Sequence, residues 1–134
     1  MCIKWHDEPD LRIVEFAQSY VMLNRDQFFP GYCFVFSKDH VTELFHLEQP
    51  RRDAVMAEVS SVAAALYRGF APAKINYELL GNMVPHMHWH LVPRFTTDPL
   101  WPRPIWSEPH DEVHLTPAEY AERIKVIKSK LNQQ

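Results

Sequence analysis

The chain has little cysteine, no excess of positive charge and no long apolar run. Cys2 and Cys33 are the only cysteines among 134 residues, too few for a disulfide framework, and this favours a reducing cytoplasm. The formal net charge of -3 provides no global basic field to recruit nucleic acid, so phosphate must be bound locally. No apolar run reaches membrane-spanning length, and the acidic first twenty residues lack the apolar segment of a signal peptide. We therefore expect a cytoplasmic protein that binds neither nucleic acid nor membrane.

What is present is the composition of one globular domain. Hydrophobic residues make up 46% of the chain and charged residues 23%, and 134 residues suffice for a real core. We expect a single domain over residues 1–134. Its core should occupy about residues 11–94, and residues 95–134 should form a proline- and tryptophan-rich tail followed by a C-terminal helix.

Apolar and aromatic runs separated by turn residues predict most of a sheet. Strands are expected at residues 20–23, 32–36, 74–80 and 86–92. Residues 11–16 suit either a strand or a short helix. Helices and strands in this order indicate an α+β fold, an antiparallel sheet of about five strands with helices packed on one face.

Helix signals are clearest in two places. Pro50 suits the first position of a helix, apolar residues then recur at helical spacing, and Gly69 is placed to stop the helix. Thr116 and Glu119 form a capping box that starts a last helix ending near Leu131. A short helix is also expected at residues 39–47.

Three histidines, His86, His88 and His90, stand at alternate positions with large apolar residues between them. Alternate side chains of a strand share one face, about 7 Å apart, so three imidazoles should form a row opposite a buried stripe. Pro85 and Pro93 are expected to flank this strand. A single strand histidine is usually structural, but three on one face indicate a functional site, because imidazole serves as nucleophile, acid, base and metal ligand.

The stretch around these histidines reads His86-Met87-His88-Trp89-His90-Leu91-Val92. It resembles the His-φ-His-φ-His-φ-φ signature of the histidine triad family of nucleotide hydrolases and transferases. The Pro93-Arg94 that follows is similar to the ending found in the fragile-histidine-triad and dinucleoside polyphosphate hydrolase branches. The resemblance implies cleavage at the α-phosphate, with a covalent nucleotidyl intermediate on His88. His86 would orient the row, and His90 would donate to phosphate oxygens.

Upstream, Leu23-Asn24-Arg25 and Pro30-Gly31 resemble the family's nucleoside-binding strand and turn. The resemblance implies that Asn24 binds the ribose hydroxyls. From the residues alone, Asn24 can equally be a turn residue that bonds its own backbone. Many fragile-type members carry a histidine directly after this Pro-Gly, where this chain has Tyr32, which we interpret as a packed strand aromatic.

The family also uses a Gln or Asn upstream of the triad to hold the phosphate chain. Asn82 and Asn76 lie four and ten residues before the first histidine, and we favour Asn82 because its short tether keeps it near the row. Arg94 can reach phosphate with its bidentate fork, or can be an exposed charge at a strand end. Met83 and Val84 stand where the family has a hydroxyl residue.

Alternatives to this enzyme are a metal-binding His-X-His protein and a non-catalytic nucleotide sensor. Three same-face histidines suit one ion poorly, because the outer two lie roughly 13 Å apart while ligand bonds measure about 2 Å. We therefore assign no metal ligand and expect no required cofactor, although Mg²⁺ can accompany a polyphosphate substrate. The expected partner is a purine nucleoside phosphate derivative.

A homodimer is also expected. The family is usually dimeric, and an alanine face at residues 63–65 beside Val59 and Val62 adds apolar surface that a small monomer rarely exposes. Trp101 and Trp106 in the proline-rich tail can stack on a base, or can cover the core or a subunit interface.

Overall fold

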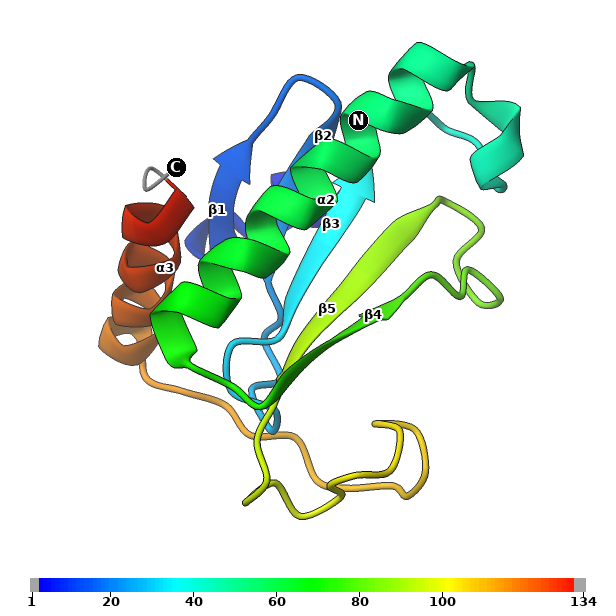
Figure 1. Cartoon of the computed structure of the whole chain (residues 1–134). Helices are drawn as coiled ribbons and strands as arrows, with labels where there is room; N and C mark the ends of the chain where they lie inside the picture. Colours follow the sequence, from blue (N-terminus) through cyan, green and yellow to red (C-terminus); the bar gives the residue numbers. More distant parts are fainter. Residues whose placement is uncertain (1–2, 132–134) are drawn as a thin grey trace.

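Five antiparallel strands form one sheet in the order β1-β2-β3-β5-β4 (Figure 1). The computed structural model describes residues 3–131. The strands are β1 (Arg12–Glu15), β2 (Ser19–Leu23), β3 (Cys33–Ser37), β4 (Lys74–Glu78) and β5 (His88–Arg94). The predicted α+β fold is confirmed, and residues 11–16 form a strand preceded by a 3-10 turn at Pro9–Leu11.

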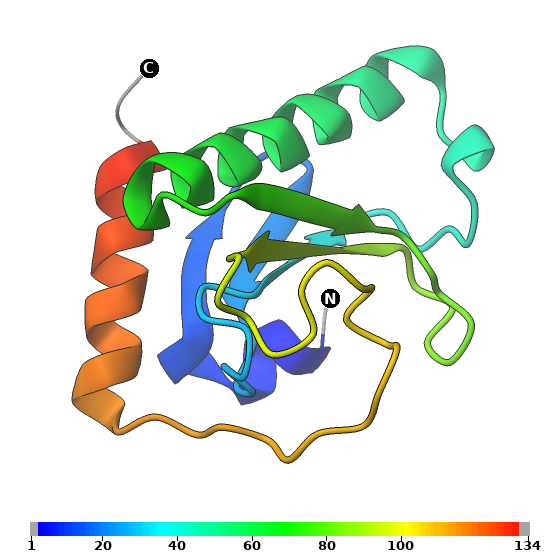
Figure 2. The ribbon, with the colours of Figure 1, turned by 60° about the horizontal axis from the view of Figure 1, so that its bottom comes forward.

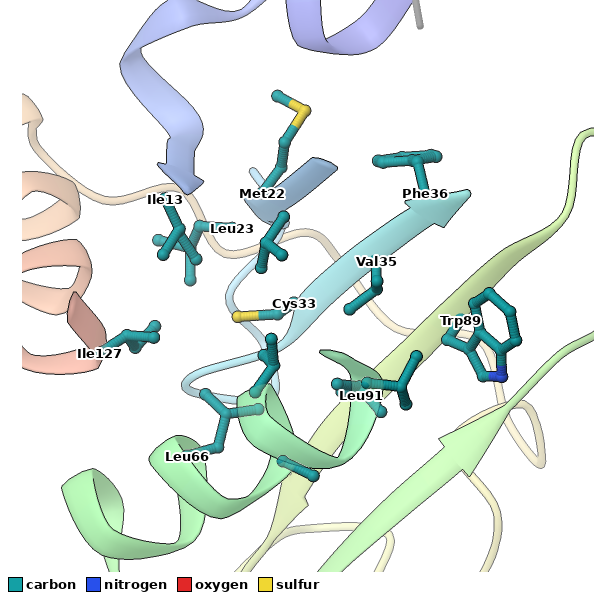
Figure 3. Packing of buried hydrophobic residues seen from close by; sticks show 14 of the residues in the cluster. Ile13, Met22, Leu23, Cys33, Val35, Phe36, Leu66, Trp89, Leu91 and Ile127 are labelled. Carbon is teal, nitrogen blue, oxygen red and sulfur yellow. The ribbon is translucent and has the colours of Figure 1, made fainter. Parts of the chain in front are cut away.

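One face of the sheet is covered by two helices (Figures 1 and 2). The long helix α2 (Gln49–Phe70) crosses the sheet diagonally, and α3 (Pro117–Leu131) packs beside α2 and β1. Leu66 of α2 points toward Val35 and Leu91 of the sheet, whereas Phe36 points to the opposite side (Figure 3). Strand alternation therefore separates a helix-covered core face from a second face.

The short helix α1 (Ile3–Asp7) lies on that second face, so the helices are not all on one side. Its Trp5 ring packs 4.9 Å from the ring of Tyr20 of β2. The sequence patterns did not predict this helix, because five residues are too few for a readable helical period. Cys33 is a buried free thiol in the core, and Cys2 lies outside the described residues.

Two helix predictions need correction. Helix α2 continues through Gly69 to Phe70, and its left-handed cap is Ala71, with φ of 49°. A Cβ on Gly69 would lie 3.0 Å from Val126, so this glycine permits the close approach of α3. The helix expected at residues 39–47 is only a 3-10 turn at Leu44–His46, since the Asp39 carboxylate pairs with Arg51 and makes no cap.

The last helix begins as predicted. Thr116 Oγ1 accepts from the Glu119 amide at 3.2 Å, and Glu119 Oε1 accepts from the Thr116 amide at 3.0 Å. The irregular tail before it runs along the sheet (Figure 2) and is anchored by Leu100 and Ile105, which are buried against Phe29. None of the helices within residues 3–131 has the length and apolar character needed to cross a membrane.

The histidine strand is shifted relative to its prediction. It starts at His88 and runs through Pro93 to Arg94. Strand β3 pairs with β5 only as far as Leu91, while Pro93 is registered with Ile75 of β4. Pro93 is tolerated inside the strand because it lies beyond the end of β3, beside Gly31, where its missing N–H costs no ladder bond.

Candidate functional site

The three histidines line one hollow of about 730 Å³ on the face opposite α2. His90 is registered with Phe34 of β3 and His88 with Phe36, so both pairs share a face. His86 precedes the strand but lines the same hollow. The apolar residues that alternate with the histidines are buried, which confirms the predicted core stripe: Met87, Trp89 and Leu91. Helix α1 closes another side of the hollow.

His88 has its proton placed by the backbone. Its Nδ1 lies 2.8 Å from the carbonyl oxygen of His86, and a carbonyl oxygen only accepts. Nδ1 therefore carries the proton, and in the neutral ring Nε2 keeps its lone pair. The Phe36 ring stacks on this imidazole at 5.5 Å and 26°, which fixes its plane. The imidazole of His88 is thus fixed in orientation, and its Nε2 lone pair can act as a nucleophile.

The two flanking histidines have different partners. His86 Nε2 donates to the backbone carbonyl of Ser37. His90 Nδ1 lies 2.6 Å from the hydroxyl of Tyr32. Burial lowers the pKa of both rings, with a further contribution from His88, and the pKa of His90 falls to about 4. His90 is therefore neutral at pH 7.

A second hollow of about 340 Å³ also borders His88 and His90. Asn82, the favoured phosphate-chain candidate, lines it together with the loop between β4 and β5. Trp106 of the tail forms another part of its wall, with its ring edge-on to His90 at 5.6 Å. The indole N–H of Trp106 donates to the carboxylate of Glu78, which holds the ring in place.

The structure gives Arg94 and Asn76 other partners. Arg94 is 1% exposed; its Nε donates to Asp98 at 2.5 Å and its guanidinium donates to Asn76 Oδ1 at 2.9 Å. Neither side chain lines either hollow. The sequence offered Arg94 as a phosphate contact or as an exposed charge. In the structure it is a buried charge instead, and its bonds to Asp98 and Asn76 join β5 to the tail and to β4.

Asn24 follows β2 and makes the turn bond that its sequence allows. Its Oδ1 accepts from the Asp26 amide at 3.1 Å, and its own amide donates to the carbonyl of Tyr32. It lines neither hollow. Within residues 3–131 its side-chain NH₂ has no hydrogen-bond partner, so a donor remains for a ligand.

Two contributions to the site were missed from sequence. Tyr32 packs against Phe34 as expected, but it also bonds His90; the signal was its place directly after Pro30-Gly31, a turn that the sequence had linked to the site. Lys4 of helix α1 and Glu8, the residue directly after it, line the large hollow, where they pair at 2.7 Å. Their spacing of four residues was the available signal for a helical turn.

Between residues 3 and 131, no three or more His, Cys, Asp or Glu side chains are grouped so as to hold a metal ion. The triad is spread along the backbone rather than gathered around one point.

Comparisons with known proteins agree with this fold. A histidine triad protein from Bradyrhizobium japonicum is 26% identical with a TM-score of 0.85, covering 98% of this chain and 96% of that one. One from Marinobacter aquaeolei VT8 is 25% identical with a TM-score of 0.85 and the same coverage. A Zn-bound histidine triad family protein from Mycobacterium smegmatis is 23% identical with a TM-score of 0.68, covering 98% and 90%.

None of the curated proteins matches the chain. The family model of the HIT domain matches residues 6–97, more than half of the sequence and all of the histidine row. Members of this family are generally nucleotide hydrolases or transferases. On this match and the shared fold, the chain belongs to the histidine triad (HIT) domain family.

Proposed function

We propose that this chain cleaves a nucleotide at its α-phosphate through a covalent intermediate on His88. The supporting observation is the bond from His88 Nδ1 to the His86 carbonyl, which leaves the Nε2 lone pair directed away from the backbone. Among residues 3–131, that nitrogen has no hydrogen-bond partner, and the ring lines both hollows. A held, neutral imidazole is a suitable nucleophile near pH 7.

The reaction has two displacements. Nε2 of His88 attacks phosphorus, a new P–N bond forms, and the bond from phosphorus to the leaving group breaks. Its electron pair goes to the departing oxygen of a polyphosphate, or to the departing nitrogen of a phosphoramidate, which takes up a proton from water. Water then attacks phosphorus and loses a proton, and the P–N electrons return to Nε2. A donor from His90, next to His88 on the strand, stabilises the charge on the equatorial oxygens.

The two hollows suit the two sides of such a substrate. In this proposal the nucleoside lies in the larger hollow, where Phe34 and Phe36 offer rings for a purine and Lys4 offers a cation for phosphate. The leaving group lies in the smaller hollow beside Asn82 and Trp106. Dinucleoside polyphosphates and nucleoside phosphoramidates are both substrates of this shape.

The test is a panel of such nucleotides at matched concentrations, with products identified by mass spectrometry. Rapid quench with an α-phosphate label should trap an acid-labile, base-stable nucleotidyl adduct on wild type and none on His88→Ala. An active enzyme that forms no adduct and is fully inhibited by chelator would overturn the covalent mechanism.

A second candidate is metal binding, and one comparison favours it: the related protein from Mycobacterium smegmatis is described as Zn-bound. In that case His86 and His88 would form a His-X-His pair that needs a further ligand from elsewhere. Chelator would then mimic loss of His88, and added Zn²⁺ would restore activity to stripped protein. Retained activity after chelation excludes this candidate.

A further inference from the structure

We infer that Tyr32 is a positioning residue that assigns the proton of His90 to Nε2, so that His90 presents a hydrogen-bond donor beside the nucleophile. The Tyr32 hydroxyl lies 2.6 Å from His90 Nδ1, and the side chains are 6% and 8% exposed. This contact joins residues 58 positions apart, from β5 and from the turn before β3.

Counting protons decides the direction of the bond. Within residues 3–131, the phenol hydrogen of Tyr32 has no acceptor other than His90 Nδ1. If Nδ1 donated to the phenol, the O–H would be buried without an acceptor, which costs more than the bond gains. The hydroxyl therefore donates to Nδ1. Burial raises the pKa of the Tyr32 phenol, which keeps this proton in place.

The consequence is a pair of adjacent imidazoles in opposite tautomers. His88 donates from Nδ1 and keeps a lone pair on Nε2, whereas His90 accepts at Nδ1 and carries its proton on Nε2. Their ring centroids are 4.9 Å apart. One ring can attack phosphorus while its neighbour donates to an oxygen of the same phosphate, without either carrying a charge beforehand.

Tyr32 is itself rigidly held. The side-chain amide of Gln27, 2% exposed, donates to the Tyr32 carbonyl at 3.1 Å and accepts from the Gly31 amide at 2.9 Å. Leu100 and Ile105 of the tail belong to the same buried cluster as Tyr32. The tail therefore helps to bury the Tyr32 side chain.

The direct test is ¹⁵N–¹H NMR of histidine side chains in the full chain at pH 7, with His90 assigned from a His90→Gln spectrum. Wild type should show His90 protonated on Nε2, with an Nδ1 resonance shifted by an accepted hydrogen bond. Tyr32→Phe keeps the ring and should move only that Nδ1 resonance toward the unbonded position. An Nδ1-protonated His90 in wild type, or an Nδ1 resonance that Tyr32→Phe leaves unchanged, would overturn the inference.

The kinetic consequence rests on the proposed function, whereas the NMR result does not. Tyr32→Phe should lower kcat about tenfold, the scale of one hydrogen bond, and leave KM within about twofold, because the bond acts on the reacting phosphate. Tyr20→Phe is the matched control, since Tyr20 is a half-buried tyrosine of β2 outside the hollows. Equal losses in both variants, or a change in KM alone, would contradict the positioning role. A wild type inactive on every nucleotide would contradict the proposed function and leave the tautomer testable.

Discussion

At the scale of single residues, the three imidazoles differ by their partners rather than by their place in a repeat. His86 bonds a backbone carbonyl from Nε2, His88 bonds one from Nδ1, and His90 bonds a phenol at Nδ1. Each bond decides which nitrogen faces the substrate. The chemistry open to each histidine therefore depends on which of its ring nitrogens carries the proton.

His88→Ala should lower turnover by a factor of about 10⁴ or more, because it removes the proposed nucleophile. The fold should be kept, since the core contacts come from Met87 and Trp89, and a nucleotide should still bind in calorimetry. His46→Ala, at an exposed turn, is the control and should be silent. Turnover within tenfold of wild type would exclude His88 as a nucleophile.

Asn24→Ala should weaken nucleotide binding by about 1 to 3 kcal/mol, the usual range for losing one partner of a hydrogen bond. The decisive comparison uses a 2′-deoxy substrate. If the Asn24 amide holds the ribose, wild type should discriminate against the deoxy form and the variant should not. The same discrimination in both proteins would leave Asn24 with its turn bond to Asp26 alone.

Burial of His90 also predicts how stability depends on pH. Its pKa is about 4 in the folded chain against 6.5 for an unperturbed histidine, so the unfolded chain binds more protons between these values. The contribution of His90 to the free energy of unfolding should therefore be fully present above pH 6.5. It should be lost on acidification toward pH 4, which lowers the free energy of unfolding by roughly 2 to 3 kcal/mol. Urea titrations at pH 7 and 5 should show a smaller difference in His90→Gln than in wild type, with His46→Gln unchanged from wild type. An equal difference in all three proteins would contradict this.

At the scale of elements, the tail after β5 is part of the sheet's support rather than an appendage. Arg94, at the end of β5, lies 5.1 Å from the Phe29 ring and is paired with Asp98 of the tail. The same tail brings Trp106 to His90. Positioning of the site therefore depends on this buried pair, although neither of its residues lines a hollow.

Arg94→Ala should destabilise the fold by about 3 to 5 kcal/mol, because it leaves the Asp98 carboxylate buried without its partner. Arg103→Ala breaks an exposed pair with Glu108 in the same segment and should cost at most about 1 kcal/mol. Chemical denaturation measures both. An Arg94→Ala protein of wild-type stability with a much larger KM would instead indicate a direct phosphate contact.

At the scale of the whole molecule, the alanine face proposed for dimer contact is used inside the monomer. Val59, Val62, Ala63 and Ala65 are buried against the sheet. A different surface remains: β4 pairs with β5 on one side only, and its Tyr77 is exposed. An unpaired strand edge beside exposed aromatic side chains favours pairing with a second copy.

We therefore expect a homodimer joined along β4, with a mass in light scattering of about twice the 15.8 kDa of one chain. Tyr77→Lys should shift the protein toward monomer, because a charge at an edge strand opposes pairing. Phe45→Lys changes an aromatic residue outside β4 that is even more exposed, and should leave the dimer unchanged. A single-chain mass at micromolar protein would reject the dimer.

The sequence by itself determined the features that depend on neighbours along the chain. Alternation of His88 and His90 with Trp89 and Leu91 separates site from core, because successive strand residues face opposite ways. The capping box at Thr116 starts the last helix through bonds spanning three residues. Such patterns are local, and local chemistry is sufficient to form them.

Only the tertiary structure decided what each polar group does. Tyr32 meets His90 across 58 positions, and Arg94 is buried because Asp98 and Asn76 converge on it from the tail and from β4. An arginine carries no local sign of whether a distant acceptor will bury it or leave it for substrate, and the place of Tyr32 after Pro-Gly did not identify His90 as its partner. The cost of an unpaired buried group selects those partners, and that cost exists only once the sheet has brought them together.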